Sequence, residues 1–204
     1  MRLYFSPGAC SLSPHIALRE AGLDFTLERV DIRACQTASG ADFLAINPKG
    51  YVPALELKDG IVLTEGPAIV QFIADLAPDR QLAPANGTLE RYQLIEWLNF
   101  LSTELHKNFG PLFRPTSTEE MKEAARTNLS NRLAWVARQL DGRDYLMGSR
   151  FTVADGYLFT ILGWAGFVQF DLSPWPVLAS YTERVAARPA VQQALRAEGL
   201  VKDA

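Results

Sequence analysis

The chain has 204 residues, a formal net charge of −3 at neutral pH and 48% hydrophobic residues. This length allows one large domain or two small ones, and either can bury a sizeable core. The slightly acidic balance offers no basic footprint for nucleic acid or for an anionic membrane. Two Cys and two His exclude a disulfide scaffold and leave too few ligands for a structural zinc site, so no metal is expected.

Targeting signals are not evident in the sequence. The apolar stretches fall short of the roughly 20 residues that span a bilayer, and the first residues lack the long apolar region of a secretory signal. These features predict a soluble, cytoplasmic protein in a reducing compartment. Either cysteine can then be a free, working thiol.

The first part of the chain alternates strand and helix signals. A short strand is predicted from Leu3 to Phe5. A helix is predicted next, with Ser13 as its N-cap, Pro14 at its first position and Gly22 just beyond its end. The alternating residues from Phe25 to Val30 predict a second strand.

An irregular or helical stretch follows, and then a hairpin signal. Apolar runs over 54–57 and 61–63 flank Lys58-Asp59-Gly60, and Asp-Gly between such runs favours a tight turn. Gly66-Pro67 then opens a helix that is expected to reach about Asp75. This order predicts a small mixed sheet with helices packed on it.

The rest of the sequence predicts helices. Apolar residues at three- and four-residue steps from Leu94 to Phe109 form one face of a helix expected to end near Gly110-Pro111. A second long helix is expected over 119–140. Thr152 and Asp155 have the spacing of a capping box at the start of a third.

The last helices and the charge pattern complete the expected organisation. The third helix is expected to reach about Phe170, and Pro189 separates two shorter helices after it. The first 80 residues carry the whole net charge, whereas the remainder is balanced. We therefore expect a mixed domain over 1–80, a linker over 81–87 and an all-helical domain over 88–204.

The sharpest chemical feature is Cys10, between the first strand and the first helix. Exposed N–H groups and the helix dipole at such a place stabilise a thiolate. A small buried hydrophobic residue is the alternative, because free cysteines are often buried. Position alone leaves both interpretations open.

The second thiol does not complete a redox pair. Cys10 to Ser13 form a C-x-x-S sequence, and Cys35 lies 25 residues further on in a polar stretch. Any redox chemistry of Cys10 is therefore expected to involve mixed disulfides with an external thiol. We interpret Cys35 as an incidental surface thiol.

The two histidines have different surroundings. His15, on the first helix, is interpreted as a packing or surface residue. On the long helix, Asn99, Thr103 and His106 form a polar line at i, i+4 and i+7. That line is either a solvated face or a cleft wall, and in the second case His106 can steady a thiolate or donate to a leaving group.

Five motifs in fixed order are similar to a known family. They are Tyr4, Ser6-Pro7-Gly8-Ala9-Cys10-Ser11, Asn47-Pro48-Lys49-Gly50-Tyr51-Val52-Pro53-Ala54-Leu55, Thr64-Glu65-Gly66-Pro67-Ala68-Ile69 and Phe151-Thr152-Val153-Ala154-Asp155. Together they resemble a cytosolic glutathione transferase of the bacterial beta class, over essentially the whole chain. The sequence also resembles members encoded with bacterial pathways for aromatic pollutants such as biphenyl.

The resemblance implies a fold class of α/β plus all-α. A thioredoxin-like N-terminal domain is expected to precede a helical-bundle domain, in a homodimer whose active site lies between the domains. Glutathione is the implied co-substrate, with no metal, nucleic acid or membrane partner. An electrophile pocket is expected to include Tyr4, Phe109 and Trp164, with Phe167 nearby in an aromatic-containing final third.

The resemblance also assigns residues to the site, with Cys10 and His106 as the catalytic pair. The glutathione contacts it implies are Ala9, Cys10, Tyr51, Val52, Pro53, Glu65, Gly66, Asn99, Thr103, Glu104, His106 and Lys107, and some of the last five can come from the partner subunit. The Val52-Pro53 bond is expected to be cis, so that the Val52 backbone pairs with the cysteinyl unit. The γ-glutamyl carboxylate is expected at the helix start formed by Glu65-Gly66, with its ammonium group on the Glu65 side chain.

The chain departs from the family pattern at three positions. Gly66 stands where Ser is usual, so a backbone donor remains but a hydroxyl is lost. Tyr51 and Cys35 stand where many members have Gln and Lys. Glutathione is then expected to bind more weakly, unless Lys49 or Lys107 replaces the missing cation.

Three functions are compatible with these residues. The first is a glutathione transferase acting on an electrophilic aromatic or halogenated substrate, by conjugation or by reductive dehalogenation. The second is glutaredoxin-like thiol-disulfide exchange or peroxide reduction through a mixed disulfide of Cys10 with glutathione. The third is a non-catalytic carrier, which the joint presence of Cys10, Val52-Pro53 and Glu65 disfavours.

Overall fold

A computed structural model describes residues 1–201. Its internal contacts divide the chain into two units. The first contains Met1–Ala83 together with the residues from Ala187 onward, and the second contains Pro84–Ala186. None of the helices within the described range has both the length and the apolar character needed to cross a membrane.

The first unit is built on a five-stranded mixed sheet. Its strands are β1 (Arg2–Phe5), β2 (Thr26–Asp31), β3 (Gln36–Thr37), β4 (Ala54–Glu56) and β5 (Val62–Thr64). They lie in the order β3-β2-β1-β4-β5, with β1 and β2 parallel and the other neighbours antiparallel. The expected hairpin around Asp59-Gly60 is confirmed as the β4–β5 pair.

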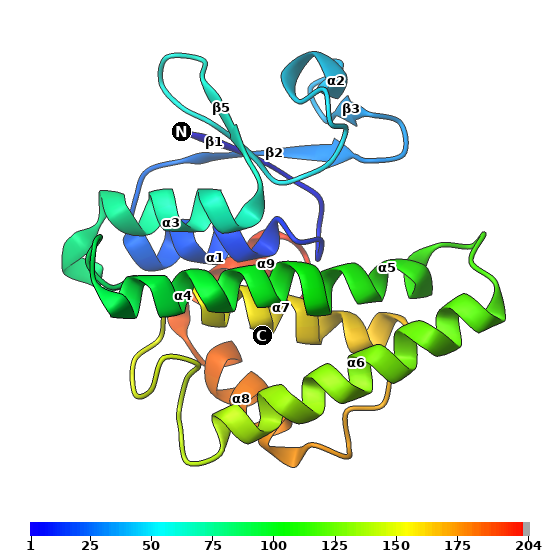
Figure 1. Ribbon diagram of the computed structural model, residues 1–204. Coiled ribbons are helices and arrows are strands. Elements are labelled where there is room, and N and C mark those ends of the chain that lie inside the picture. Colours follow the sequence, from blue (N-terminus) through cyan, green and yellow to red (C-terminus); the bar gives the residue numbers. More distant parts are fainter. Residues whose placement is uncertain (202–204) are drawn as a thin grey trace. The chain divides into compact units, whose positions relative to one another are not determined.

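Helices cover both faces of this sheet. They are α1 (Leu12–Ala21), the short α2 (Phe43–Ile46) and α3 (Gly66–Leu76), with a 3₁₀ turn at Pro78–Arg80. A further helix, α9 (Pro189–Ala197), packs on α1. In Figure 1, α1 and α3 lie side by side below the sheet, and α2 lies above it. The mixed α/β character expected for this part of the chain is confirmed.

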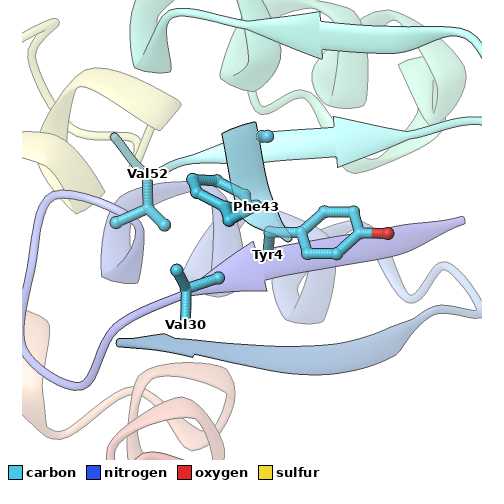
Figure 2. Packing of buried hydrophobic residues seen from close by; sticks show 5 residues of the cluster. Tyr4, Val30, Phe43 and Val52 are labelled. Carbon is cyan, nitrogen blue, oxygen red and sulfur yellow. The ribbon is translucent and has the colours of Figure 1, made fainter. Parts of the chain in front are cut away.

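One sheet face carries a compact apolar cluster. Tyr4, Val30, Phe43, Val52 and Ala54 are all buried there, and Figure 2 shows the rings of Tyr4 and Phe43 next to each other. Their centroids are 5.8 Å apart. This packing fixes the segment just before β4, which carries Val52, against the sheet.

The first helix begins earlier than the sequence suggested. Ser13 is not its N-cap; the helix starts at Leu12, after Ser11. Pro14 therefore falls in the first turn, where a missing N–H costs nothing because it has no helical partner in any case. Gly22 ends the helix in the left-handed conformation, as expected.

The second unit is helical. It contains α4 (Leu89–Phe100), a π-helical segment (Leu101–His106), α5 (Lys107–Phe113), α6 (Glu119–Leu140), α7 (Val153–Phe167) and α8 (Pro176–Ala186). In Figure 1, α4 and α5 form one continuous rod, and α6 returns along it after a loop. The all-helical character expected here is confirmed.

Two helix ends differ from the sequence prediction. The long helix does not stop at Gly110-Pro111 but continues to Phe113, with Pro111 inside its last turns. Proline has a helix-compatible φ, so the chain stays helical through Pro111, although the missing N–H removes the hydrogen bond to the Lys107 carbonyl. The helix expected to reach Phe170 ends at Phe167, because Gln169 adopts a positive φ of 53°.

The expected capping box at the start of α7 is confirmed. The Asp155 side chain accepts from the Thr152 N–H at 2.8 Å and from the Thr152 hydroxyl at 2.9 Å. It also accepts from the Leu146 N–H at 2.8 Å and from the Tyr181 hydroxyl at 3.0 Å. Burial raises the pKa of this carboxyl to about 6, although the four donors oppose the increase.

The C-terminal part of the chain differs from its expected place. Residues 88–204 were predicted to form one helical domain, but α9 packs on α1 of the first unit. The change of unit between Ala83 and Pro84 falls within the stretch predicted as a linker, 81–87. Residues 202–204 of the predicted domain lie outside the described residues.

Candidate functional site

Cys10 lies directly before the N-terminus of α1, and its thiol faces the segment that leads into β4. The half-buried Sγ atom donates to the Val52 carbonyl oxygen at 3.1 Å. The Val52-Pro53 bond is cis, as expected. The fold thus brings together two predicted site residues that are 42 positions apart in the sequence.

A hydroxyl bridge shapes the loop that carries Cys10. Ser11 Oγ accepts from the Ser6 N–H at 3.1 Å and lies 3.2 Å from the Ser6 carbonyl oxygen, to which it donates. The Ala9 N–H also donates to that carbonyl, at 3.0 Å. The side chain of Ala9 packs against the cluster around Tyr4, so the loop is anchored on both sides of the thiol.

The start of α3 carries a group of polar side chains. Glu65 Oε1 accepts from Lys49 Nζ at 2.6 Å and from the Tyr51 hydroxyl at 2.7 Å. Lys49 Nζ also donates to Thr64 Oγ1 at 3.0 Å. The hydrogen bonds to Glu65 raise the pKa of Lys49 and of Tyr51. Three residues expected near glutathione or its carboxylates are therefore joined.

Glu65 has an unusual backbone conformation. Its φ of 71° and ψ of 112° lie in a region that costs a non-glycine residue roughly 1–3 kcal/mol. Strain of this kind concentrates at functional positions, because the surrounding structure must maintain it. The conformation supports a functional assignment for this turn.

Gly66 and Pro67 determine how α3 meets a ligand. Pro67 has no N–H, and the N–H groups of Ala68 and Ile69 donate to the Glu65 carbonyl. Gly66 is the first residue of α3, so its N–H is the donor of this turn that suits an anion. A Cβ atom at Gly66 would meet only Pro53 Cγ, at 4.0 Å, so the usual Ser would fit.

His106 ends the π-helical segment of the second unit. Its Nδ1 lies 2.7 Å from the Tyr157 hydroxyl, and its ring meets Trp164 edge-on with centroids 4.7 Å apart. Burial, and to a smaller extent the charge of Lys107, lowers the pKa of His106 to about 4. The imidazole is therefore neutral near pH 7 and can serve as a hydrogen-bond partner.

The other predicted residues of this helix have varied surroundings. Asn99, Thr103 and Lys107 are exposed. The Thr103 hydroxyl donates to the Asn99 carbonyl at 3.0 Å, and Glu104 accepts from Arg132 Nε at 2.8 Å. The π-helical winding changes the angle between successive side chains. Of the predicted polar line, Asn99 and Thr103 are exposed, whereas His106 is partly buried.

The three residues predicted to line an electrophile pocket are core residues of their units. Tyr4 is 3% exposed, and its hydroxyl donates to Glu56 at 2.8 Å. Phe109 and Trp164, on α5 and α7, are buried and meet edge-on with centroids 5.7 Å apart. Phe167 is 70% exposed. The His106 ring contacts two aromatic residues, Tyr157 and Trp164. Of these, only Trp164 was predicted from the sequence to belong to the site.

Cys35 lies beside the same turn as Tyr51. A Cβ atom added to Gly50 would be 3.9 Å from Cys35 Sγ, and this thiol donates to the Ile32 carbonyl at 3.6 Å. Neither cysteine forms a disulfide. Within residues 1–201, no group of three or more His, Cys, Asp or Glu side chains is arranged to hold a metal ion.

Sequence reasoning missed a cavity of about 470 Å³ in the second unit. Trp97, Phe100 and Trp135 line it, with ring centroids 4.7–6.0 Å apart. Trp97 and Phe100 are spaced i, i+3, a helical-face signal, but their pairing with Trp135 on α6 depends on the tertiary fold.

Comparisons with known proteins agree with this architecture. The family model for the glutathione S-transferase N-terminal domain matches residues 8–76, and that for the C-terminal domain matches residues 100–189. The chain is 51% identical to glutathione S-transferase GstA of Escherichia coli O157:H7, over 98% of this chain and 100% of the relative.

Solved structures show the same likeness. A ternary complex of BphK, a bacterial GST, is 62% identical with a TM-score of 0.97, covering 98% of this chain and 100% of that one. A sphingomonad glutathione S-transferase complexed with glutathione is 51% identical with a TM-score of 0.95 and the same coverage. Another similar structure is a beta-class enzyme of Sphingomonas chungbukensis. The chain belongs to the glutathione S-transferase family and resembles its bacterial beta class throughout.

Proposed function

We propose that the protein is a glutathione transferase that directs the thiol of glutathione onto an electrophilic aromatic or halogenated substrate, with Cys10 as its active-site thiol. The observation that carries the proposal is the contact of Cys10 Sγ with the Val52 carbonyl at 3.1 Å. An extended cysteinyl unit paired with the Val52 backbone would bring its own sulfur toward this thiol.

In the proposal, the turn at the start of α3 binds the γ-glutamyl group. The Gly66 N–H holds the α-carboxylate and the Glu65 carboxylate holds the ammonium group. Lys49 and Tyr51, which contact Glu65 in the structure, then exchange this partner for the ligand. Lys49 supplies the cation that Cys35 cannot.

The helical residues complete the proposed site. His106, neutral because of its burial, is assigned to the sulfur of glutathione as a hydrogen-bond partner. Asn99, Thr103, Glu104 and Lys107 are assigned to the remaining polar groups of the tripeptide, from either subunit. Ala9 and Pro53 border the cysteinyl unit.

Two reactions follow from a thiol at this position. In conjugation, the glutathione thiolate attacks the electrophilic carbon and the halide leaves with the bonding electrons. In reductive dehalogenation, the Cys10 thiolate then attacks the sulfur of that adduct, and the carbon leaves with the electron pair and takes a proton. A second glutathione reduces the Cys10–glutathione disulfide, so two glutathione thiols become one disulfide.

Glutaredoxin-like exchange is the second candidate. It uses the same Cys10–glutathione disulfide but needs no electrophile. The half-buried position of the reduced Cys10 thiol beside a helix N-terminus favours this chemistry as well. A disulfide-reduction assay set against a chloro-dinitroarene conjugation assay separates the two activities.

The test compares Cys10→Ala with Cys35→Ser. We expect Cys10→Ala to abolish reductive activity and to retain part of the conjugation, because conjugation requires only the thiol of glutathione. Cys35→Ser should match the wild type in both assays. Equal retention of both activities in Cys10→Ala would remove Cys10 from the mechanism, and a protein that millimolar glutathione fails to stabilise against heat would be a carrier of another ligand.

We also propose that the enzyme is a cytoplasmic homodimer. Two cysteines that form no disulfide suit a reducing compartment. Exposed apolar side chains on α4 and α6, Leu89, Tyr92 and Trp135, offer a surface for a second copy. Sedimentation equilibrium should give twice the chain mass of 22.6 kDa, and the single chain mass would refute the dimer.

A further inference from the structure

Glu198, the residue that follows α9, is buried in the first unit beside α1. Its side chain and that of His15 are both 0% exposed. Glu198 Oε1 lies 2.8 Å from His15 Nδ1, and Oε2 accepts from the Gly8 N–H at 2.9 Å. One carboxylate therefore joins the C-terminal end of the chain to α1 and to the loop that carries Cys10.

The surrounding hydrogen bonds indicate which ring nitrogen of His15 carries the hydrogen. Arg19 Nε donates to His15 Nε2 at 3.4 Å, so Nε2 is the acceptor nitrogen and Nδ1 carries the hydrogen that Glu198 accepts. Both Glu198 oxygens then face donors. The ring of His15 is held by Phe25, edge-on with centroids 5.6 Å apart, which leaves the imidazole little freedom to turn.

Gly8 connects this group to the thiol. It lies two residues before Cys10 and has a φ of 70°, a left-handed conformation that side chains disfavour. A Cβ atom there would also meet Leu200 Cδ2 at 3.4 Å. The residues after α9 therefore hold the loop from one side, while the Ser11 hydroxyl holds it from the other by its two contacts with Ser6.

We propose that Glu198 is a positioning residue for Cys10. By accepting from the Gly8 N–H, it fixes the loop so that the thiol faces the Val52 carbonyl, and His15 with Arg19 fixes Glu198. This inference rests on the proposed function, in which Cys10 is the reacting thiol. The turn after α9, far from Cys10 in sequence, would then help to position the reacting thiol.

The test uses the full chain with Cys35→Ser, so that Cys10 is the remaining thiol. The rate of mixed-disulfide formation with oxidised glutathione is measured at fixed pH, together with kcat and KM for glutathione. We expect Glu198→Ala to lower the disulfide rate and kcat about tenfold or more, since displacement of a reacting group by about 1 Å can cost about 100-fold. KM should change by less than about threefold, because the Val52 and Glu65 contacts remain.

Glu198→Gln is the conservative variant. Its amide oxygen can still accept from the Gly8 N–H, but its NH2 group then faces His15 Nδ1, which loses its acceptor. We therefore expect rates between those of the wild type and those of Glu198→Ala. Glu20→Ala is the matched control, because Glu20 on α1 also binds the C-terminal segment, through Arg188 Nε at 2.6 Å and Nη2 at 2.8 Å, just before α9. It should lower the unfolding midpoint but leave the Cys10 rates unchanged.

Three results would overturn the inference. They are wild-type Cys10 rates in a folded Glu198→Ala, equal losses of rate in Glu198→Ala and Glu20→Ala, and fast amide exchange at Gly8 in the unmodified protein. The last measurement decides the case if Glu198→Ala does not fold. An unreactive Cys10 in the Cys35→Ser parent would instead refute the proposed function.

Discussion

Single residues in this protein owe their chemical state to burial and to a few hydrogen bonds. His106 is neutral because it lies in a dry environment against Tyr157 and Trp164. The Cys10 thiol donates to the Val52 carbonyl oxygen. The sequence singled out the reactive residues, but the partners that control them come from other elements and could not be predicted from local patterns.

The titration of His106 is a direct prediction at this scale. Its pKa of about 4 in the folded protein lies below the ordinary value of 6.5. In the unfolded chain, His106 therefore binds a proton below about pH 6.5, whereas in the folded protein it binds that proton only below about pH 4. The unfolding free energy should fall by roughly 2–3 kcal/mol from this residue as the pH drops through that window.

NMR titration of the His106 ring measures the pKa itself, with His15→Gln to assign the signals. In His106→Phe, this contribution to the pH dependence should disappear. A midpoint near 6.5 would show that the ring is solvated, contrary to our account.

Gly66 carries a second prediction at the residue scale. The space around it admits a side chain, so Gly66→Ser should add a hydroxyl donor to the γ-glutamyl carboxylate. One added hydrogen bond of about 1 kcal/mol corresponds to roughly fivefold tighter glutathione binding. Isothermal titration calorimetry measures this change.

Gly163→Ser is the control for Gly66→Ser. Gly163 lies exposed in α7 with open space around it, and its substitution should not alter the affinity. If Gly66→Ser binds glutathione no better than the control, the carboxylate does not lie at the start of α3.

Among the elements, the starts of α1 and α7 differ in how far local sequence signals determine them. The capping box of α7 could be predicted because all its atoms lie within four residues. The true start of α1 could not, since it depends on a hydroxyl bridge between Ser6 and Ser11. The π-helical winding before His106 has no sequence signature that we could apply.

Asp155 provides the prediction at this scale. Asp155→Ala removes an acceptor that serves four donors and leaves the buried N–H groups of Leu146 and Thr152 without it. We expect a loss of about 3 kcal/mol or more in the unfolding free energy, measured by urea denaturation.

Asp171→Ala is the matched variant, because Asp171 is exposed and caps only a surface turn at Ser173. It should cost under about 1 kcal/mol. Similar losses in the two variants would contradict a dominant role for the capping box of α7.

The whole molecule shows one departure from simple sequential domains. The two fold classes could be predicted from periodicity, and the change of unit after Ala83 falls within the stretch expected as a linker, 81–87. The return of α9 to the first unit could not, because its amphipathic pattern specifies a buried face but not the helix that covers it. For the same reason, the buried contacts of Glu198 could not be predicted, because in the sequence it is an ordinary charged residue at a helix end.

A deletion of residues 187–204 tests this organisation. It removes the buried side chains of Val191 and Leu195, each of which contributes roughly 1.5–3 kcal/mol when buried, and it uncovers α1. We expect the unfolding free energy of the first unit to fall by several kcal/mol. All four tryptophans, Trp97, Trp135, Trp164 and Trp175, belong to the second unit, so their fluorescence reports on that unit alone.

In the deletion variant, far-UV circular dichroism should therefore show an early loss of structure that tryptophan fluorescence does not share. In the wild type the two probes serve as the reference. Coincident transitions at the wild-type midpoint in the variant would show that α9 does not stabilise the first unit.

The central claim is that Cys10 is the thiol that reacts with glutathione. Intact mass of the purified protein after treatment with oxidised glutathione, with and without reductant, tests it most directly. We predict a gain of one glutathione that maps to Cys10, is reversed by reductant, persists in Cys35→Ser and is absent in Cys10→Ser. An adduct confined to Cys35, or no adduct at all, would contradict the account.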